Sequence, residues 1–372
     1  MKSFSINYLL AVLLLLFGCS QDKTKVVEDV RILDLEDVEK LSDTNLITDI
    51  EYIPLSSKGD HFIGEVCRVI FKNNMFYIFD FLVNNSVMVF NDSGGFEYEI
   101  SKTGNGPGEY VSVSDFEVDD SGNIYMMDAG GQKMICYSDR GQSFKVIRLP
   151  KFFIEFAFAK NNKMVAYRPF SSSGLEDCYG IVDLNENKYE TIFPLRDFID
   201  EHGTFKELSH IFSSGGDLWF SPRLSNRIYS FRDDKAIERY RFKDGLLPEK
   251  IDEGLLNEYG SIRQSPEYIS SIKGIFETDN TVMISYQMRY VENLLVSKNT
   301  DKLCLLRDIL PAEMPGKHRI IGSDGDVFIS VVNKLRVEDI EALNLSDKDK
   351  KRFQDYDYNS NPVIALFKVR KF

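Results

Sequence analysis

Hydrophobic and polar positions along the chain repeat one hairpin pattern six times. In each copy a polar turn precedes a short apolar strand, then a gap, then a second strand that ends in another polar turn. The equivalent apolar positions are Phe76, Ile124, Met164, Leu218, Val282 and Val327. They lie 48, 40, 54, 64 and 45 residues apart. Such a period, with several short strands per unit, is typical of a β-propeller with one blade per repeat.

The fold class predicted is therefore all-β, a six-bladed propeller of four-stranded antiparallel blades over residues 47–372. In blade one we expect strands at 66–71, 76–79, 86–90 and 96–100, with Asn, Asp and Gly in the tight turn at 91–95. The last blade ends with a strand at 362–369. Alternation in 47–55 predicts one more strand in that blade, which would close the ring and hide its edges.

Two long insertions break the rhythm, one at 244–271 and one at 333–361. Both are charged and have helical spacing, and Ser346 with Asp349 resembles a capping box in which Asp replaces Glu. Each insertion is either ordinary loop decoration or a lid over one face of the propeller.

The first residues predict export. Lys2 is followed by an apolar run at 9–17, which is too short to cross a membrane but fits a signal peptide. The run ends in Gly18 and Cys19, a pair that resembles the lipobox of bacterial lipoproteins. We expect residues 1–18 to be removed, Cys19 to be lipidated, and polar residues 19–46 to form a tether. The alternative is a plain signal peptide in which Cys19 occurs by chance.

Charge and cysteine content narrow the possible partners. The net charge is −13, and loss of Lys2 with the leader makes it more negative. Nucleic acids bind positively charged surfaces, so a chain this acidic is not expected to bind them. Anionic lipid would repel the chain as well, so we expect membrane contact through the lipid anchor only. Cys67, Cys136, Cys178 and Cys304 are scattered, which favours free thiols over a disulfide or a metal site. No cofactor and no metal are expected.

Four segments give the chain a family resemblance. They are residues 50–55, the glycine loop 104–110, residues 224–229 and residues 361–364. On these segments the chain resembles the six-bladed propeller lipoproteins of Bacteroidetes, which are similar to NHL-repeat propellers. The resemblance implies the propeller fold, export and a place in the bacterial cell envelope, where we expect the outer membrane. It implies little about activity, since one propeller fold hosts many functions.

Three polar segments could suggest ligand sites but favour structural roles. The glycine loop 104–110 could suggest a phosphate cradle, yet it lacks the P-loop pattern and opens no helix. Its glycines favour a sharp turn between blades. The Asp-rich segments 119–123 and 324–326 could suggest calcium, but they occupy hairpin turns and lack the EF-hand spacing.

The candidate ligand site lies on the face where loops join the blades and where each second strand turns into the third. Ligands of propellers usually sit over the channel on that face. Arginines there suit an anionic ligand and tyrosines suit a sugar or aromatic ring. The candidate binding residues are Asp80, Glu109, Tyr110, Asp128, Arg168, Arg223, Arg289 and Tyr290. The alternative is that these acids and arginines pair with one another and with backbone.

Three functions remain open from the sequence. The first is a binding or protein-interaction module on the envelope, with a small molecule, glycan or envelope protein as partner. The second is a lyase or hydrolase acting on a glycan or peptide, with His210 and His318 as candidate catalytic residues beside an acid such as Asp128. The third is a structural subunit of an envelope complex, which would need a large apolar patch on its side or on the inserted helices.

Overall fold

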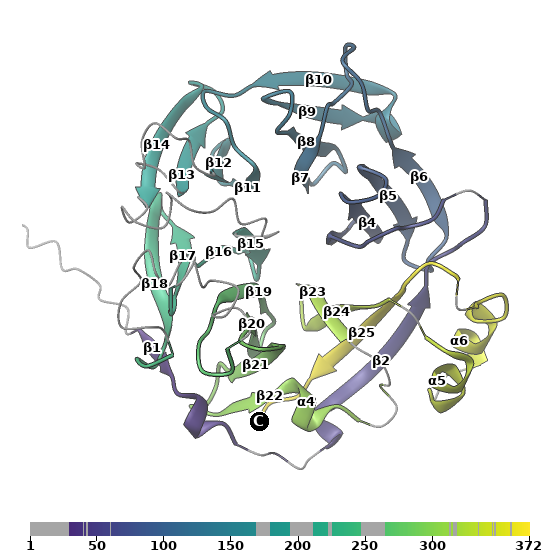
Figure 1. Cartoon of the computed structure of the whole chain (residues 1–372), viewed down its shortest axis with the longest axis vertical. Helices are drawn as coiled ribbons and strands as arrows, with labels where there is room; N and C mark the ends of the chain where they lie inside the picture. The colour runs from purple at the N-terminus through teal and green to yellow at the C-terminus, as the bar shows by residue number, and fades with distance from the viewer. Residues whose placement is uncertain are drawn as a thin grey trace, which may run out of the picture.

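A computed structural model shows six sheets arranged as blades around a central channel (Figure 1). It describes residues 30–39, 41, 44–59, 61–168, 179–193, 211–221, 225–246, 265–311, 314, 318–333, 335–343, 345, 347–357 and 359–372. Each blade is an antiparallel ladder of four strands, so the predicted six-bladed propeller is confirmed. No helix in this described part is both long and apolar enough to span a membrane.

The first three blades follow the chain without interruption, and each runs from the channel outward. Blade one is β3 (Arg68–Lys72), β4 (Met75–Asp80), β5 (Ser86–Asn91) and β6 (Phe96–Ile100). Blade two is β7 (Val113–Val118), β8 (Ile124–Asp128), β9 (Lys133–Ser138) and β10 (Ser143–Arg148). Blade three is β11 (Glu155–Ala159), β12 (Lys163–Tyr167), β13 (Tyr179–Asp183) and β14 (Lys188–Phe193).

The other three blades complete the ring. Blade four contains β15 (Ile211–Ser214), β16 (Asp217–Phe220), β17 (Arg227–Arg232) and β18 (Lys235–Phe242). Blade five contains β19 (Ser271–Glu277), β20 (Thr281–Gln287), β21 (Val291–Ser297) and β22 (Leu303–Leu305), followed by the short helix α4 (Leu306–Ile309). Blade six contains β23 (His318–Asp324), β24 (Val327–Val332) and β25 (Val363–Val369).

Blade six is completed by β2 (Ile47–Pro54), which pairs antiparallel with β25. This is the closing strand that the alternation in 47–55 predicts. The ring is thus held shut by hydrogen bonds between the two ends of the propeller sequence, which removes the exposed edges an open ring would have.

The segment before β2 differs from the expected tether. Residues Arg31–Leu33 form β1, which adds a fifth, parallel strand to the outer edge of blade four beside β18. The short 3-10 helices η1 (Leu35–Asp37) and η2 (Thr44–Leu46) follow, and Val38 bridges to Leu303 of blade five. The chain therefore passes over the rims of blades four and five before it closes blade six. Three residues are too few for an alternating pattern to mark β1 in the sequence.

The insertion in blade six carries the helices α5 (Val337–Ala342) and α6 (Asp347–Arg352), as the helical spacing predicts. The helices pack on blade six through Leu335, Leu343 and Phe353, and Arg352 donates to Glu51 of β2 at 2.7 Å. Figure 1 places them at the periphery, away from the channel. For this insertion the lid hypothesis is therefore wrong. Ser346 and most of the 244–271 insertion lie outside the described residues.

Apolar side chains fill the wedges between neighbouring blades. Between blades one and two, the rings of Phe79 and Phe116 are 5.7 Å apart within a fully apolar cluster. Between blades four and five, Phe212 and Phe276 are 6.5 Å apart. Cys67, Cys136 and Cys304 are free thiols, as expected. This packing fixes the inner strands, and with them the walls of the channel.

Candidate functional site

The central channel holds a cavity of about 1200 Å³, lined mainly by the inner strands β3, β15, β19 and β23. The two ends of the channel are formed by different kinds of connection, and we name them the loop face and the turn face. The loop face is formed by the loops between blades (55–67, 101–112, 149–154) and the loops between second and third strands (81–85, 129–132, 288–290). The turn face is formed by the tight turns that join first to second and third to fourth strands.

Two candidate residues of the loop face are fully buried acids at equivalent positions in blades one and two. Asp80 accepts hydrogen bonds from the amides of Gly64 (2.7 Å) and Val83 (3.1 Å). Asp128 accepts from the amides of Val111, Ser112 and Gly131 at 2.9–3.1 Å. Each carboxylate thus joins the loop between blades to the loop of its own blade. The geometry gives both acids a structural role, and both are fully buried. Asp128 Oδ2 accepts no hydrogen bond from the described residues and lies 3.7 Å from Lys133 Nζ.

The glycine loop 104–110 contains two more candidate residues, Glu109 and Tyr110. The Glu109 side chain fills the space inside the loop. The Glu109 carboxylate accepts from the Gly106 amide at 2.7 Å, and a Cβ on Gly104 would lie 2.0 Å from Glu109 Oε2. Tyr110 is fully buried and its hydroxyl donates to the Asn85 carbonyl at 2.8 Å. Burial raises the pKa of Tyr110. With a carboxylate already inside, the loop repels anions, which favours the sharp-turn interpretation over the phosphate cradle.

The remaining candidates do not form one cluster. Arg168 stacks over Tyr189 of the outer strand β14, with 5.8 Å from guanidinium carbon to ring centroid. Arg289 lies on the loop face of blade five, exposed and stacked on Tyr290 at 5.6 Å. Of these, Tyr290 lines the channel cavity. Cys19, His210 and Arg223 lie outside the described residues.

His318 also lines the cavity, at the start of β23. Its Nδ1 lies 3.0 Å from Ser330 Oγ on the neighbouring strand β24. The acid considered as its catalytic partner, Asp128, is in blade two and is occupied by backbone amides. The described residues therefore bring His318 to the channel without that acid.

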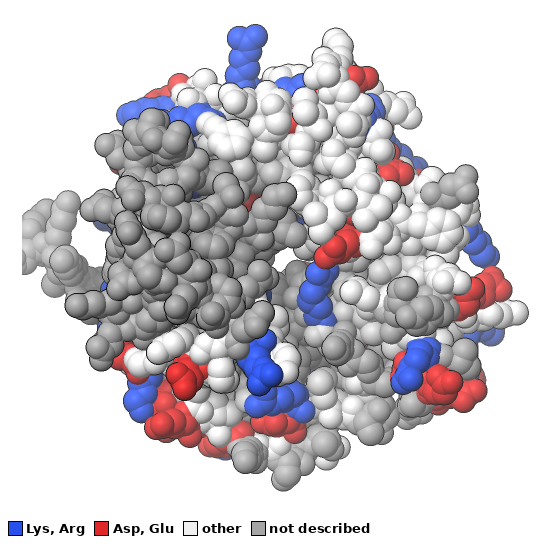
Figure 2. All heavy atoms as spheres, in the orientation of Figure 1, with Lys and Arg blue, Asp and Glu red and all other residues white. Residues whose placement is uncertain are grey.

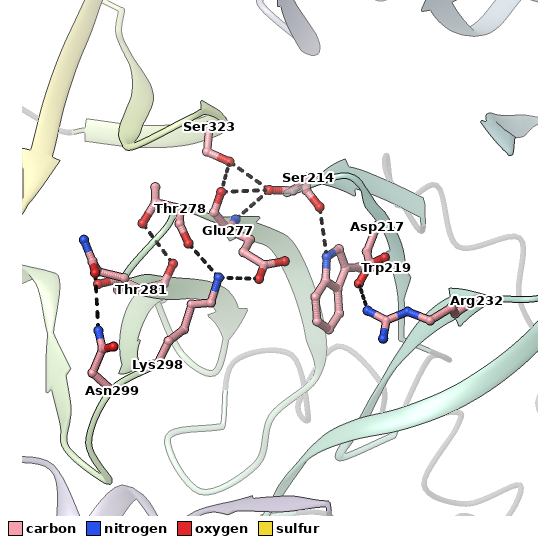
Figure 3. A network of polar contacts seen from close by, with 11 residues as sticks. Ser214, Asp217, Trp219, Arg232, Glu277, Thr278, Thr281, Lys298, Asn299 and Ser323 are labelled. Carbon is pink, nitrogen blue, oxygen red and sulfur yellow. Dashed lines mark hydrogen bonds and ion pairs between the residues drawn. The ribbon is translucent and has the colours of Figure 1, made fainter. Parts of the chain in front are cut away.

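A polar network at the turn end of the cavity joins blades four, five and six (Figure 3). Ser214 Oγ and Ser323 Oγ are 2.8 Å apart, and Ser323 donates to the Glu277 carbonyl at 2.9 Å. The Glu277 carboxylate in turn pairs with Lys298 at 2.7 Å. The hydrogen-bonding groups of this network bond to one another across the blade boundaries. The network therefore has a structural role, which is to hold blades four, five and six together.

A second polar cluster in the channel wall was missed by the sequence analysis. Arg68 of β3 forms ion pairs with Asp115 and Glu117 of β7, and Asp115 also accepts from the Phe156 amide of β11 at 2.9 Å. Burial, with a smaller contribution from the nearby Glu155 carboxylate and opposed by Arg68, raises the pKa of Asp115 to about 7. The sequence did contain a signal for this cluster, because Asp115 and Glu117 occupy alternate positions of β7 and side chains at alternate positions share one face of a strand.

Exposed apolar side chains were also missed, and they gather on one face. The described residues expose nine large apolar side chains, and six of them lie in or next to loop-face loops: Phe62, Leu82, Val83, Val111, Tyr290 and Val291. The other three, Ile32, Phe144 and Val146, are on the outer strands β1 and β10. None is in a described turn of the turn face. Figure 2 looks onto the loop face, which is largely uncharged over blades one and two.

Four of these side chains lie on three loops that contact one another, and we name them the apolar ridge: Phe62, Leu82, Val83 and Val111. Asn84 donates to the Phe62 carbonyl at 2.7 Å, and a Cβ on Gly64 would lie 2.4 Å from Val83 Cβ. Asn85 accepts from the Val113 amide and from the Tyr110 hydroxyl at 3.1 and 2.8 Å. Three consecutive loops are thus in contact, and the ridge runs across them. Apolar residues within otherwise Asn- and Gly-rich loops were the sequence signal for it.

Comparisons with known proteins agree with this fold. A family model described as a domain of unknown function (DUF4934) matches residues 30–368. A crystal structure from Bacteroides fragilis, of a protein inferred to be exported, is 19% identical with a TM-score of 0.74 and covers 92% of this chain and 100% of its own. A DUF4221 family member from Bacteroides vulgatus is 11% identical with a TM-score of 0.59, covering 88% and 98%. The search of curated proteins finds no match.

Proposed function

The chain belongs to the DUF4934 family, and we propose that it is a binding propeller of the bacterial cell envelope, anchored through Cys19, whose loop face engages a partner. The alternatives of a lyase or hydrolase and of a purely structural subunit receive no comparable support from the described residues. The observation that carries the proposal is the one-sided distribution of exposed apolar side chains.

The anchoring part rests on the leader. The apolar run at 9–17 followed by Gly18 and Cys19 is the pattern of an exported and lipidated protein. The similar Bacteroides fragilis protein is inferred to be exported as well. The polar residues that follow Cys19 give the propeller a tether, and the proposed site of the anchor is the outer membrane.

The binding part rests on the contrast between the two faces. Single exposed apolar residues are common on protein surfaces, but contiguous ones mark interaction sites. Here the apolar ridge spans three loops of blades one and two, whereas the described turns of the opposite face expose Asn, Asp and Gly. Leu82 is 56% exposed and Val83 is 66% exposed, and contact of these aliphatic side chains with water is unfavourable. A binding partner that covers them would remove this contact.

A thermal-shift screen of the mature protein tests the proposal. Metals, glycans, peptides and small anions are compared, since a ligand that binds only the native state raises the melting temperature. We expect at least one class to shift the wild type, and Leu82→Ser with Val83→Ser to abolish the shift. The matched control, Ile32→Ser with Val146→Ser, changes exposed apolar residues on outer strands and should retain it. No shift with any class, or a shift that survives the loop-face change, contradicts the proposal.

A further inference from the structure

The cations that line the channel cavity are mostly neutralised by carboxylates. Arg68 pairs with Asp115 and Glu117, and Arg307 pairs with Glu292. Lys72 lies 2.7 Å from Asp120, and Lys298 lies 2.7 Å from Glu277. Lys273 of β19 lines the cavity as well and also has an interaction partner.

Arg319 differs from these cations. It is the second residue of β23, at the loop-face end of the channel, and its guanidinium donates to the carbonyl oxygen of Val66. Among the described residues no carboxylate lies within ion-pair distance of it. Partial desolvation lowers the pKa of Arg319, and the Cys67 thiol and the Glu65 carboxylate act against this shift. The side chain nevertheless remains open to solvent through the cavity.

A guanidinium that has no carboxylate partner among the described residues can bind an anion. It has five N–H donors in a rigid plane, and only one contact, to a carbonyl, is made within the described protein. A carboxylate can accept two parallel hydrogen bonds from such a group. The Arg319 side chain is exposed at the cavity, so an anion can reach its remaining N–H donors from solvent.

Arg319 is also placed next to the apolar ridge. The loop that accepts its hydrogen bond at Val66 carries Phe62 four residues earlier, and Gly64 between them touches Val83. Figure 2 shows basic side chains at the edge of the central opening and a mostly uncharged surface beside it. An apolar surface thus leads to a cationic group at the mouth of the channel.

We infer that Arg319 is an anion anchor and that its occupant is a polypeptide segment, whose carboxylate pairs with this guanidinium while its apolar side chains lie on the apolar ridge. The inference rests on the proposed function and gives its partner a chemical class. Aliphatic Leu82, Val83 and Val111 suit apolar amino-acid side chains, whereas a glycan would be expected to stack on several aromatic rings. The carboxylate belongs either to the C-terminus of the segment or to an Asp or Glu side chain.

The test uses two libraries of seven-residue peptides, one with free C-terminal carboxylates and one with C-terminal carboxamides. Both are passed over the immobilised mature protein, and retained peptides are quantified by mass spectrometry. We expect apolar peptides with a carboxylate to be retained about tenfold or more over matched neutral ones, the factor that a charge-assisted pair of hydrogen bonds supplies. Preference for the free-carboxylate library indicates a C-terminus, and enrichment of Asp or Glu in both indicates a side chain.

The variants decide whether Arg319 is responsible. Arg319→Gln should remove the preference for carboxylates, and Arg319→Lys should retain part of it, because a lysine keeps the charge without the planar fork. Arg148→Gln, an exposed change on the outer strand β10, is the control and should leave it intact. Since Arg319 has no carboxylate to lose, Arg319→Gln should not lower the melting temperature.

Three results would overturn the inference. One is retention that does not depend on a carboxylate, the second is a carboxylate preference that survives Arg319→Gln, and the third is no retention of either library. None of these results decides the proposed function, which the thermal-shift screen tests. A metal, glycan or anion that raises the melting temperature by binding at the loop face would still support a binding propeller, with a different partner.

Discussion

At the scale of single residues, the same side-chain type has different roles according to its position in the repeat. Asp80 and Asp128 end the second strands of blades one and two, are fully buried, and accept amides from two loops each. Asp92, in a turn, is exposed. From the sequence all three are Asp in a polar loop, and burial separates them only after the blades are packed together. This is why the sequence could name Asp80 and Asp128 but not their role.

Replacing Asp128 tests that role. Asp128→Ala leaves three backbone amides without their acceptor, and each buried unsatisfied donor costs about 1–3 kcal/mol. We expect the free energy of unfolding to fall by about 3 kcal/mol or more, measured by urea denaturation. Asp92→Ala should change it by no more than about 0.5 kcal/mol, as is usual for surface changes. Equal effects of the two changes would refute the structural role.

The channel-wall acid Asp115 predicts a pH dependence of stability. Its folded pKa, raised to about 7 by burial, lies above the ordinary value of 3.8. Between these values the folded state holds a proton that the unfolded state has lost, so this contribution to stability is present at low pH and is lost as the pH rises through 7. The urea midpoint of the wild type should therefore rise more, on going from pH 8 to pH 5, than that of Asp115→Asn.

The control for this measurement is Asp120→Asn. The hydrogen bond and charge of Lys72 lower the pKa of Asp120, so its contribution is present above the ordinary Asp pKa and is lost only in more acidic solution. Between pH 8 and pH 5 the Asp120 variant should follow the wild type. Parallel curves for the wild type and Asp115→Asn would contradict the elevated pKa.

At the scale of elements, sequence reasoning succeeded where a pattern was long and repeated. The strands after each polar turn and the closing strand β2 were predicted within a few residues of their bounds, and helical structure was predicted within the 333–361 insertion without helix bounds. It failed for β1, where Arg31–Leu33 offers only one buried side chain, Leu33. A strand this short is fixed by the outer edge of blade four, which supplies the hydrogen bonds, and not by its own residues.

A pair of neighbouring substitutions tests the attachment of β1. Leu33 is fully buried against blades four and five, whereas Ile32 is 52% exposed. Leu33→Ala should lower the free energy of unfolding by about 2–5 kcal/mol, the range for buried leucines, and Ile32→Ala should have a small effect. Similar small effects at both positions would show that residues 31–33 do not pack on the propeller. Hydrogen exchange of 235–242 reports directly on the pairing with β18.

At the scale of the whole molecule, the propeller separates two surfaces of different character. The repeated turns, rich in Asn, Asp and Gly, make one face polar, and on that face the Ser214, Glu277 and Ser323 network joins blades four, five and six. The opposite face carries the apolar ridge and Arg319, which has no carboxylate partner among the described residues. The sequence analysis placed the candidate ligand site on the same face as our proposal does, but it named polar residues there. The ridge is assembled from three loops, and only the fold brings these loops into contact.

The most direct measurement of the central claim is photo-cross-linking in cells that express the protein. A benzophenone amino acid replaces Leu82 on the apolar ridge or Asn74 on the turn face of the same blade, both exposed. The account predicts a discrete adduct with a polypeptide from position 82 that is lost with Arg319→Gln, and none from position 74. Adducts from position 74 alone, or equally from both, would show that the loop face is not the binding surface.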